Sequence, residues 1–153
     1  MIRLKTLAEI EAIARSGAVL AGLFAALPQQ IRPGTTTADL DRFAEEFIRS
    51  HPGAEPAFKG LYGFPANICT SVNHEVVHGI PSRRCVLKEG DIISVDVGVK
   101  LDGWYADAAV TYAVGEIDEE ARRLLTVTEE ALRLGIAQAV VGNRLGDIGS
   151  AIQ

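Results

Sequence analysis

The chain has few of the features that mark secreted and membrane proteins. It contains only two cysteines, Cys69 and Cys85, which are too few for a disulfide framework, so reduced thiols are expected. No uninterrupted apolar run of about 18 residues occurs, and no membrane-spanning helix is therefore expected. Acidic residues soon interrupt the apolar ones that follow Met1, which is unlike a signal peptide. Together these absences predict a cytoplasmic protein that does not bind a membrane.

Basic patches and several common site motifs are missing too. The net charge is −5, and lysine and arginine form no stripe, which argues against direct binding of nucleic acid. The patterns H-E-x-x-H, C-x-x-C and G-x-G-x-x-G do not occur, so zincin, zinc-ribbon and dinucleotide-binding folds have no support. What is present is an ordinary balance, 48% hydrophobic and 23% charged, over a length that fits one domain spanning residues 1–153.

Helical periodicity dominates the first third of the chain. Thr6–Glu9 matches a capping box, and apolar residues then recur at helical spacing, which predicts a helix over about residues 8–26. A second capping signal at Thr36–Asp39 opens another helix, which is expected to end before His51.

The last third predicts two further helices. Ile117–Glu120 opens the third helix, and Gly142-Asn143 is its expected C-cap. Residues 144–153 begin the pattern of a fourth. The third helix carries one apolar face, made of Leu124, Leu125, Thr128, Ala131, Leu132, Ile136 and Val140.

The middle of the chain is rich in strand signals. Ile68–Val72 and Val76-Val77 are candidates for short strands. Residues 91–99 and 104–114 are rich in β-formers, and the segment Leu101–Trp104 between them predicts a hairpin turn. The expected order is helix, helix, strands, helix, helix, which is typical of a mixed α/β fold.

The predicted hairpin places two aspartates together. If Asp102-Gly103 is the two-residue loop, Asp107 lies opposite Gly98, and Asp96 is the diagonal neighbour of Asp107 on the same face. Like charges side by side persist if a cation neutralises them, if one carboxyl is protonated, or if the face is solvated.

The residue types of this pair leave two interpretations open. Carboxylate oxygens suit Mn, Fe, Co or Zn ions that also have nitrogen ligands, and Gly98 opposite Asp107 would leave space for an ion or ligand. A solvent-facing polar stripe on an antiparallel sheet is an equally simple explanation.

Single histidines and cysteines add further candidates. His78 precedes a Gly-x-Pro turn and is expected at a strand end, where it could be a ligand, a proton donor, a substrate contact or a structural side chain. Cys69 has no obvious base beside it in the sequence and is interpreted as a packing residue. His74 and His51 are expected in a loop and at the surface.

Several segments together resemble a known family. They are G-F-P-A-N-I-C-T-S-V-N, V-V-H-G-I-P, L-K-E-G-D-I-I-S-V-D-V-G and D-G-W-Y-A-D. The chain is similar in these segments, and over essentially its whole length, to type I methionine aminopeptidases of the pita-bread metallopeptidase superfamily. The resemblance implies half of a pita-bread fold, a curved antiparallel sheet with helices packed on its outer face. Residues 1–153 would then be the N-terminal half of the catalytic domain, with the second half absent.

The resemblance also assigns roles to residues. It implies that Asp96 and Asp107 are metal ligands and that His78 contacts the substrate and acts in catalysis. It implies a pocket for the methionine side chain that is formed by Phe58, Leu61, Phe64 and Cys69, together with His78. Two divalent metal ions, Co, Mn, Fe or Zn, are expected in the complete protein. The family's remaining ligands, a histidine and two glutamates, match nothing after Asp107, so weak or no metal binding is expected of this chain.

The implied activity is removal of the initiator methionine from nascent polypeptides. Expected partners are the N-termini of nascent peptides, with the ribosome as a further candidate. The isolated chain is expected to be inactive and to self-associate through the surface that a half fold exposes. Two alternatives are a metal-free pita-bread module that binds proteins and a proline-specific peptidase of the same superfamily. The retained Asp96, Asp107 and His78 favour an enzyme.

Overall fold

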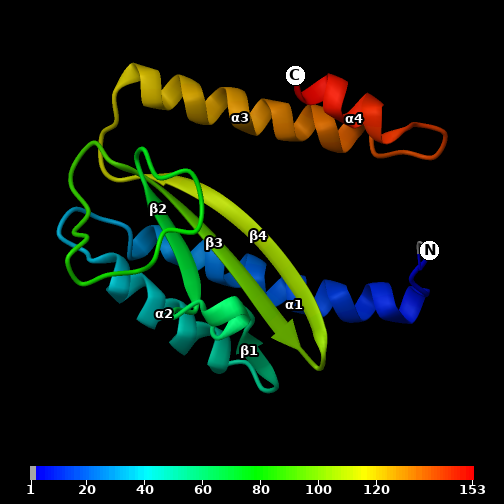
Figure 1. Ribbon diagram of the computed structural model, residues 1–153, viewed down its shortest axis with the longest axis horizontal. Coiled ribbons are helices and arrows are strands. Elements are labelled where there is room, and N and C mark those ends of the chain that lie inside the picture. Colours follow the sequence, from blue (N-terminus) through cyan, green and yellow to red (C-terminus); the bar gives the residue numbers. More distant parts are fainter. Residues whose placement is uncertain (1–2) are drawn as a thin grey trace. The chain divides into compact units, whose positions relative to one another are not determined.

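The computed structural model describes residues 3–153, which form two compact units, Met1–Glu116 and Ile117–Gln153. The first unit contains two α-helices, two short 3-10 helices at Leu27–Gln29 and Leu61–Gly63, and a four-stranded sheet, and the second contains two α-helices. Figure 1 labels the helices and strands of both units.

Both predicted N-terminal helices are present, and each begins at a capping box. Helix α1 spans Leu7–Ala26, and Thr6 accepts a hydrogen bond from the Glu9 amide while the Glu9 carboxylate accepts one from the Thr6 amide. Helix α2 spans Thr37–Arg49 and starts with the same arrangement at Thr36. The local capping chemistry that is visible in the sequence therefore sets where both helices begin.

The sheet is antiparallel and is centred on one long strand. Strand β3, Ile92–Leu101, pairs along its full length with β4, Trp104–Ala113. Its other edge pairs with β2, Ile68–Val72, and with β1, Ala54–Pro56. The predicted bounds of β2 are confirmed. Strand β1 was not predicted, and Val76-Val77 lies in a loop, so the prediction of a strand there was wrong.

The core lies between α1, α2 and one face of this sheet. Figure 1 shows both helices on the same side of the curved strands. Two hydrogen bonds tie α1 to β4, from the Ser16 hydroxyl to the Trp104 carbonyl at 2.8 Å and from the Tyr112 hydroxyl to the Phe24 carbonyl at 3.1 Å. The expected mixed α/β fold, an antiparallel sheet with helices packed on it, is confirmed. The most buried large apolar side chains of this core are Leu23, Leu27, Leu40, Ile48, Ile68, Leu87, Ile93, Val95, Val97, Val99 and Val114.

Helix α1 also meets a length and hydropathy test for a membrane span. Residues Leu7–Gln29 have a mean hydropathy of 1.6 in their most apolar stretch, and residues 16–31 carry no charged side chain. This is weak evidence, since core helices of soluble proteins meet the same test. Here Val19, Leu20 and Leu23 are buried, and α1 packs against β3 and β4.

The second unit is a helical hairpin with almost no interior. Helix α3 spans Glu119–Ala137 and is capped by Asp118, which accepts from the Ala121 amide at 2.7 Å. The expected C-cap at Gly142-Asn143 was wrong, because α3 ends at Ala137 and its C-cap is Gln138. The predicted fourth helix is confirmed as α4, Leu145–Ile152, which doubles back beside α3 (Figure 1).

Candidate functional site

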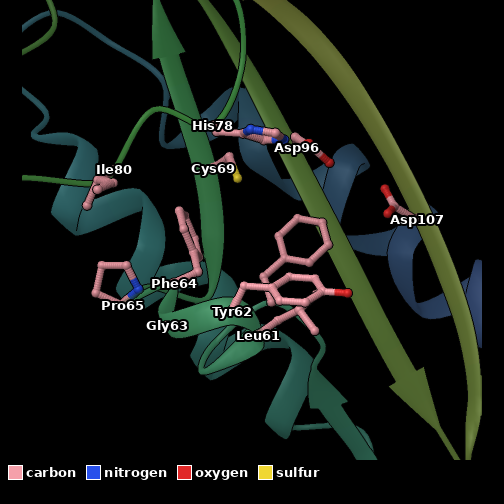
Figure 2. Close-up of a pocket in the computed structure, with 11 residues that line it drawn as sticks. Leu61, Tyr62, Gly63, Phe64, Pro65, Cys69, His78, Ile80, Asp96 and Asp107 are labelled. Atoms are coloured by element: carbon pink, nitrogen blue, oxygen red, sulfur yellow. The ribbon is translucent and has the colours of Figure 1, made fainter.

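The hairpin β3–β4 has the register that its turn predicts. Leu101 pairs with Trp104, Gly98 with Asp107, and Asp96 with Ala109. Both turn residues have positive φ, 51° at Asp102 and 85° at Gly103, as a tight hairpin requires. The predicted diagonal relation of Asp96 and Asp107 is therefore confirmed, and Figure 2 shows the two carboxylates projecting from neighbouring strands.

Burial of the opposite face is what directs these carboxylates outward. Ile93, Val95, Val97 and Val99 alternate along β3 and are fully buried in the core. The intervening residues must then point to the other face, since side chains alternate along a strand. A one-residue slip would place Asp96 in the apolar core, so the register of the pair is strongly specified.

Strand β2 adds Cys69 to the same face. Cys69 pairs directly with Asp96 across the two strands and is 4% exposed. Burial, followed by the negative charges of Asp96 and Asp107, raises the pKa of the Cys69 thiol to about 11. The sulfur is therefore a neutral thiol at neutral pH, as a packing residue requires.

His78 reaches the site from the loop between β2 and β3, not from a strand end. Its φ is 60°, an uncommon conformation for a residue other than glycine. The next residue, Gly79, accepts a hydrogen bond from the Thr70 amide at 2.9 Å and donates to the Ser71 hydroxyl at 3.1 Å. A Cβ at Gly79 would overlap the Thr70 carbonyl oxygen, so only glycine allows the loop to lie this close to β2.

The side chains that the sequence singled out line one cavity of about 590 Å³ (Figure 2). All seven predicted site residues are in its lining, although their roles stay predictions. Four lining residues were missed. Tyr62, Gly63 and Pro65 lie in a segment where Gly60, Tyr62 and Gly63 have positive φ, and its glycine and proline content was the only sequence signal for them. The fourth, Ile80, follows Gly79 in the loop that carries His78. The cavity is lined by Phe58, Leu61, Tyr62, Gly63, Phe64, Pro65, Cys69, His78, Ile80, Asp96 and Asp107.

Gly98 does not leave open space beside Asp107, contrary to the sequence-based interpretation. A Cβ on Gly98 would lie 2.5 Å from Phe58 Cε1, so the space over this glycine holds an aromatic ring. The interpretation of Gly98 as room for an ion was wrong, because the Phe58 ring already fills that room.

The two carboxylates repel each other in this setting. Burial raises the pKa of Asp96, as do the charge of Asp107 and a hydrogen bond shared with it, while the charge of His78 lowers it. A negative pair that is partly desolvated favours either a proton or a cation. Asp107 and His78 are exposed, so an ion could enter from solvent.

The donor set fits part of a divalent metal site. Two carboxylates on one face are suitable oxygen ligands for Mn, Fe, Co or Zn. Within residues 3–153, no group of three or more His, Cys, Asp or Glu side chains is arranged to hold a metal ion. The residues present can therefore supply some of the ligands for such an ion but not a complete coordination sphere.

Comparison with known proteins gives a consistent picture. The model of metallopeptidase family M24 matches residues 11–153. A curated methionine aminopeptidase from Clostridium acetobutylicum is 53% identical over the whole chain, which spans 61% of that protein. The crystal structure of methionine aminopeptidase from Thermotoga maritima is 45% identical, with a TM-score of 0.96 over all of this chain and 61% of its own.

A more distant structure shares the fold alone. Prolidase from Pyrococcus furiosus is 21% identical, with a TM-score of 0.85 over 97% of this chain and 42% of its own length. These likenesses confirm the predicted similarity to type I methionine aminopeptidases and the pita-bread class of fold.

Proposed function

Because the chain belongs to metallopeptidase family M24, we propose that its parent protein is a metal-dependent methionine aminopeptidase. The reaction is hydrolytic removal of the initiator methionine from nascent polypeptides. The observation that carries the proposal is the convergence of Asp96, Asp107 and His78 on one cavity with an apolar wall. The chain spans 61% of the length of the curated relative described above, so the activity is that of a longer protein.

Each residue of the cavity has a physical role in this proposal. Asp96 and Asp107 would hold divalent ions, Co, Mn, Fe or Zn, from adjacent strands. Such ions supply Lewis acidity and lower the pKa of water toward neutrality. His78 lies beside Asp96 (Figure 2) and would donate a hydrogen bond to the substrate carbonyl as negative charge develops on its oxygen.

The apolar wall would select the N-terminal side chain. Phe58, Leu61 and Phe64 offer carbon surface, and the neutral thiol of Cys69 is a soft contact for a thioether. Binding there would hold the first peptide bond next to the carboxylates, which is the positioning that the reaction needs.

The isolated chain is proposed to be the N-terminal half of the catalytic domain and inactive. Two carboxylates cannot complete a dinuclear site, and weak or no metal binding is expected. The cavity is also open, since Leu61, His78 and Asp107 are exposed, so water would not be excluded from it. Release of methionine from Met-Ala-Ser by the purified 153-residue chain would contradict this.

The central test uses the complete, metal-loaded protein. Wild type should release methionine from Met-Ala-Ser, whereas Asp96→Asn and Asp107→Asn should lose bound metal and fall to background activity. Asp102→Asn is a matched control, because this residue lies in the turn of the same hairpin and does not line the cavity. Equal metal content and activity in all four proteins would reject the assignment of the ligands.

Two alternatives have distinct outcomes. A metal-free protein-binding module would show no metal in the complete protein even though its carboxylates are intact. A proline-specific peptidase would prefer Xaa-Pro to Met-Ala substrates. The 45% identity to a methionine aminopeptidase, against 21% to a prolidase, favours the first substrate class.

The cellular setting is part of the same proposal. A cytoplasmic location fits two free cysteines, Cys69 and Cys85, and a substrate that emerges during translation. The expected partners are nascent peptide N-termini and the ribosome, without direct binding of nucleic acid or membrane.

A further inference from the structure

Gly98 occupies a position where the backbone does not require glycine. It lies in the middle of β3, and the pairing of Val97, Gly98 and Val99 with β4 runs without a bulge. Gly98 is also not one of the glycines with positive φ in residues 3–153. Glycine inside a strand is unfavourable, and it often marks the close approach of another group.

The group that approaches is the side chain of Phe58. A Cβ on Gly98 would lie 2.5 Å from Cε1 and 2.9 Å from Cδ1 of that ring, and 3.0 Å from the Cβ of Ala57. The first two distances are shorter than any ordinary carbon contact. The ring therefore rests on the bare backbone of β3, and any side chain at residue 98 would displace it.

The segment that carries Phe58 has little freedom to move away. The Ala57 amide donates to the Gly98 carbonyl at 2.9 Å, and the preceding residue, Pro56, pairs with Val99. The main chain next to Phe58 is therefore hydrogen-bonded to Gly98, the residue that the Phe58 ring covers. A larger side chain at residue 98 would rotate the ring before it moved the strand.

We propose that Gly98 determines substrate specificity by seating the Phe58 ring against β3. Gly98 pairs with Asp107 and lies two residues from Asp96, so the ring forms the cavity wall beside both carboxylates. With the ring against the strand, the cavity is deep enough for a long unbranched side chain. This inference rests on the proposed aminopeptidase function and adds a positioning residue that does not itself touch substrate.

The test compares side-chain preference in the complete, metal-loaded protein. The measured quantity is kcat/KM for Met-Ala-Ser divided by kcat/KM for the same peptide with norvaline, whose side chain is shorter, in place of methionine. Gly98→Ala should lower this ratio about tenfold, because the displaced ring shortens the cavity. The ratio should change less than twofold for the same substitution in a Phe58→Ala background, since no ring remains to be displaced.

Matched variants keep the proposal open to rejection. Gly17→Ala adds the same methyl group in α1, where a Cβ would meet nothing within 4 Å, and should leave the ratio unchanged. Phe58→Leu adds no atom at residue 98, so it tests the proposal even if Gly98→Ala folds poorly. It should raise activity on a peptide whose N-terminal side chain is one carbon longer than that of methionine. An unchanged ratio in Gly98→Ala, or an equal change in both backgrounds, would overturn the proposal.

A second measurement does not depend on catalysis. In NMR spectra of the 153-residue chain, Phe58 ring protons should show cross-relaxation to the Gly98 Hα protons, and Gly98→Ala should reduce their contact with β3. A ring that stays in place would overturn the proposal. If the wild-type complete protein released no methionine, the proposed function would be rejected, and the specificity inference with it. If the wild type were active and Gly98→Ala had the same side-chain preference, only the specificity inference would be rejected.

Discussion

The units Met1–Glu116 and Ile117–Gln153 are both built around amphipathic helices, but they differ in what covers the apolar faces. In the first unit, Leu23 and Leu40 are fully buried against the sheet. In the second, Gly135 alone is buried, where it admits Ile148 and Ile152 of α4, while Leu124 is 53% and Ile136 64% exposed. An apolar stripe predicts a helix equally well in both cases, but it does not say whether the chain itself supplies the cover.

The contrast is sharpest for one matched pair of substitutions. Leu23→Ala, in the core of the first unit, should lower the free energy of unfolding by about 2–5 kcal/mol, because it leaves a cavity. Leu124→Ala makes the same change on the exposed face of α3 and should cost less than about 0.5 kcal/mol. Urea unfolding of both variants measures the difference. Similar losses would mean that α3 has a buried face in solution.

Cysteine reactivity repeats the contrast within the first unit. At pH 7.5, iodoacetamide should modify the partly exposed Cys85 well before Cys69 in the metal-free chain. A pKa of about 11 leaves Cys69 with about 100-fold less thiolate than the usual value of 9.0 would. Because the raised pKa keeps the proton on the thiol, the rate should rise as pH increases toward 11. Mass spectrometry of the peptides gives both rates, and urea should equalise them. Equal rates in the folded chain would contradict the burial of Cys69.

Loss of a buried hydrogen-bond acceptor should lower the free energy of unfolding more than loss of an exposed helix cap. The Asp41 carboxylate accepts hydrogen bonds from the backbone amide of Asn67 at 2.7 Å and the backbone amide of Ile68 at 3.1 Å, where β2 begins. Asp41→Ala leaves these buried donors without an acceptor and should cost about 1–3 kcal/mol in thermal or urea unfolding. Asp118→Ala removes the exposed cap of α3 and should cost about 1 kcal/mol or less. A larger loss of stability for Asp118→Ala than for Asp41→Ala would contradict the difference in burial between the two units.

The uncovered face of α3 should make the isolated chain self-associate. Two copies that pack these exposed apolar side chains together about a two-fold axis would bury them, so we expect a weak two-fold dimer.

Light scattering over a range of concentrations tests this expectation. Leu124→Glu should lower the average mass toward the monomer, whereas Ala137→Glu, five residues beyond Leu132 and off the apolar face, should not. A monomeric mass for the wild type at high concentration would contradict it.

The best sequence predictions concerned features that neighbouring residues control. The capping boxes at Thr6 and Thr36 began both helices correctly, and the Asp102-Gly103 turn gave the correct pairing of Asp107 with Gly98. The failures involved contacts between distant segments. Strand β1 is only three residues long and exists because it pairs with the far end of β3. Helix α3 ends early, and the Asn143 side chain donates to the Gln138 carbonyl just beyond it.

The candidate site divides in the same way. The sequence by itself determined that Asp96 and Asp107 share one face, since alternation along a strand and a two-residue turn are local properties. Only the tertiary structure decided that His78 reaches that face from a loop anchored by Gly79, and that Gly98 seats the Phe58 ring. Both outcomes depend on how closely one backbone approaches another, which is set by packing across many residues and leaves no periodic signal in the sequence.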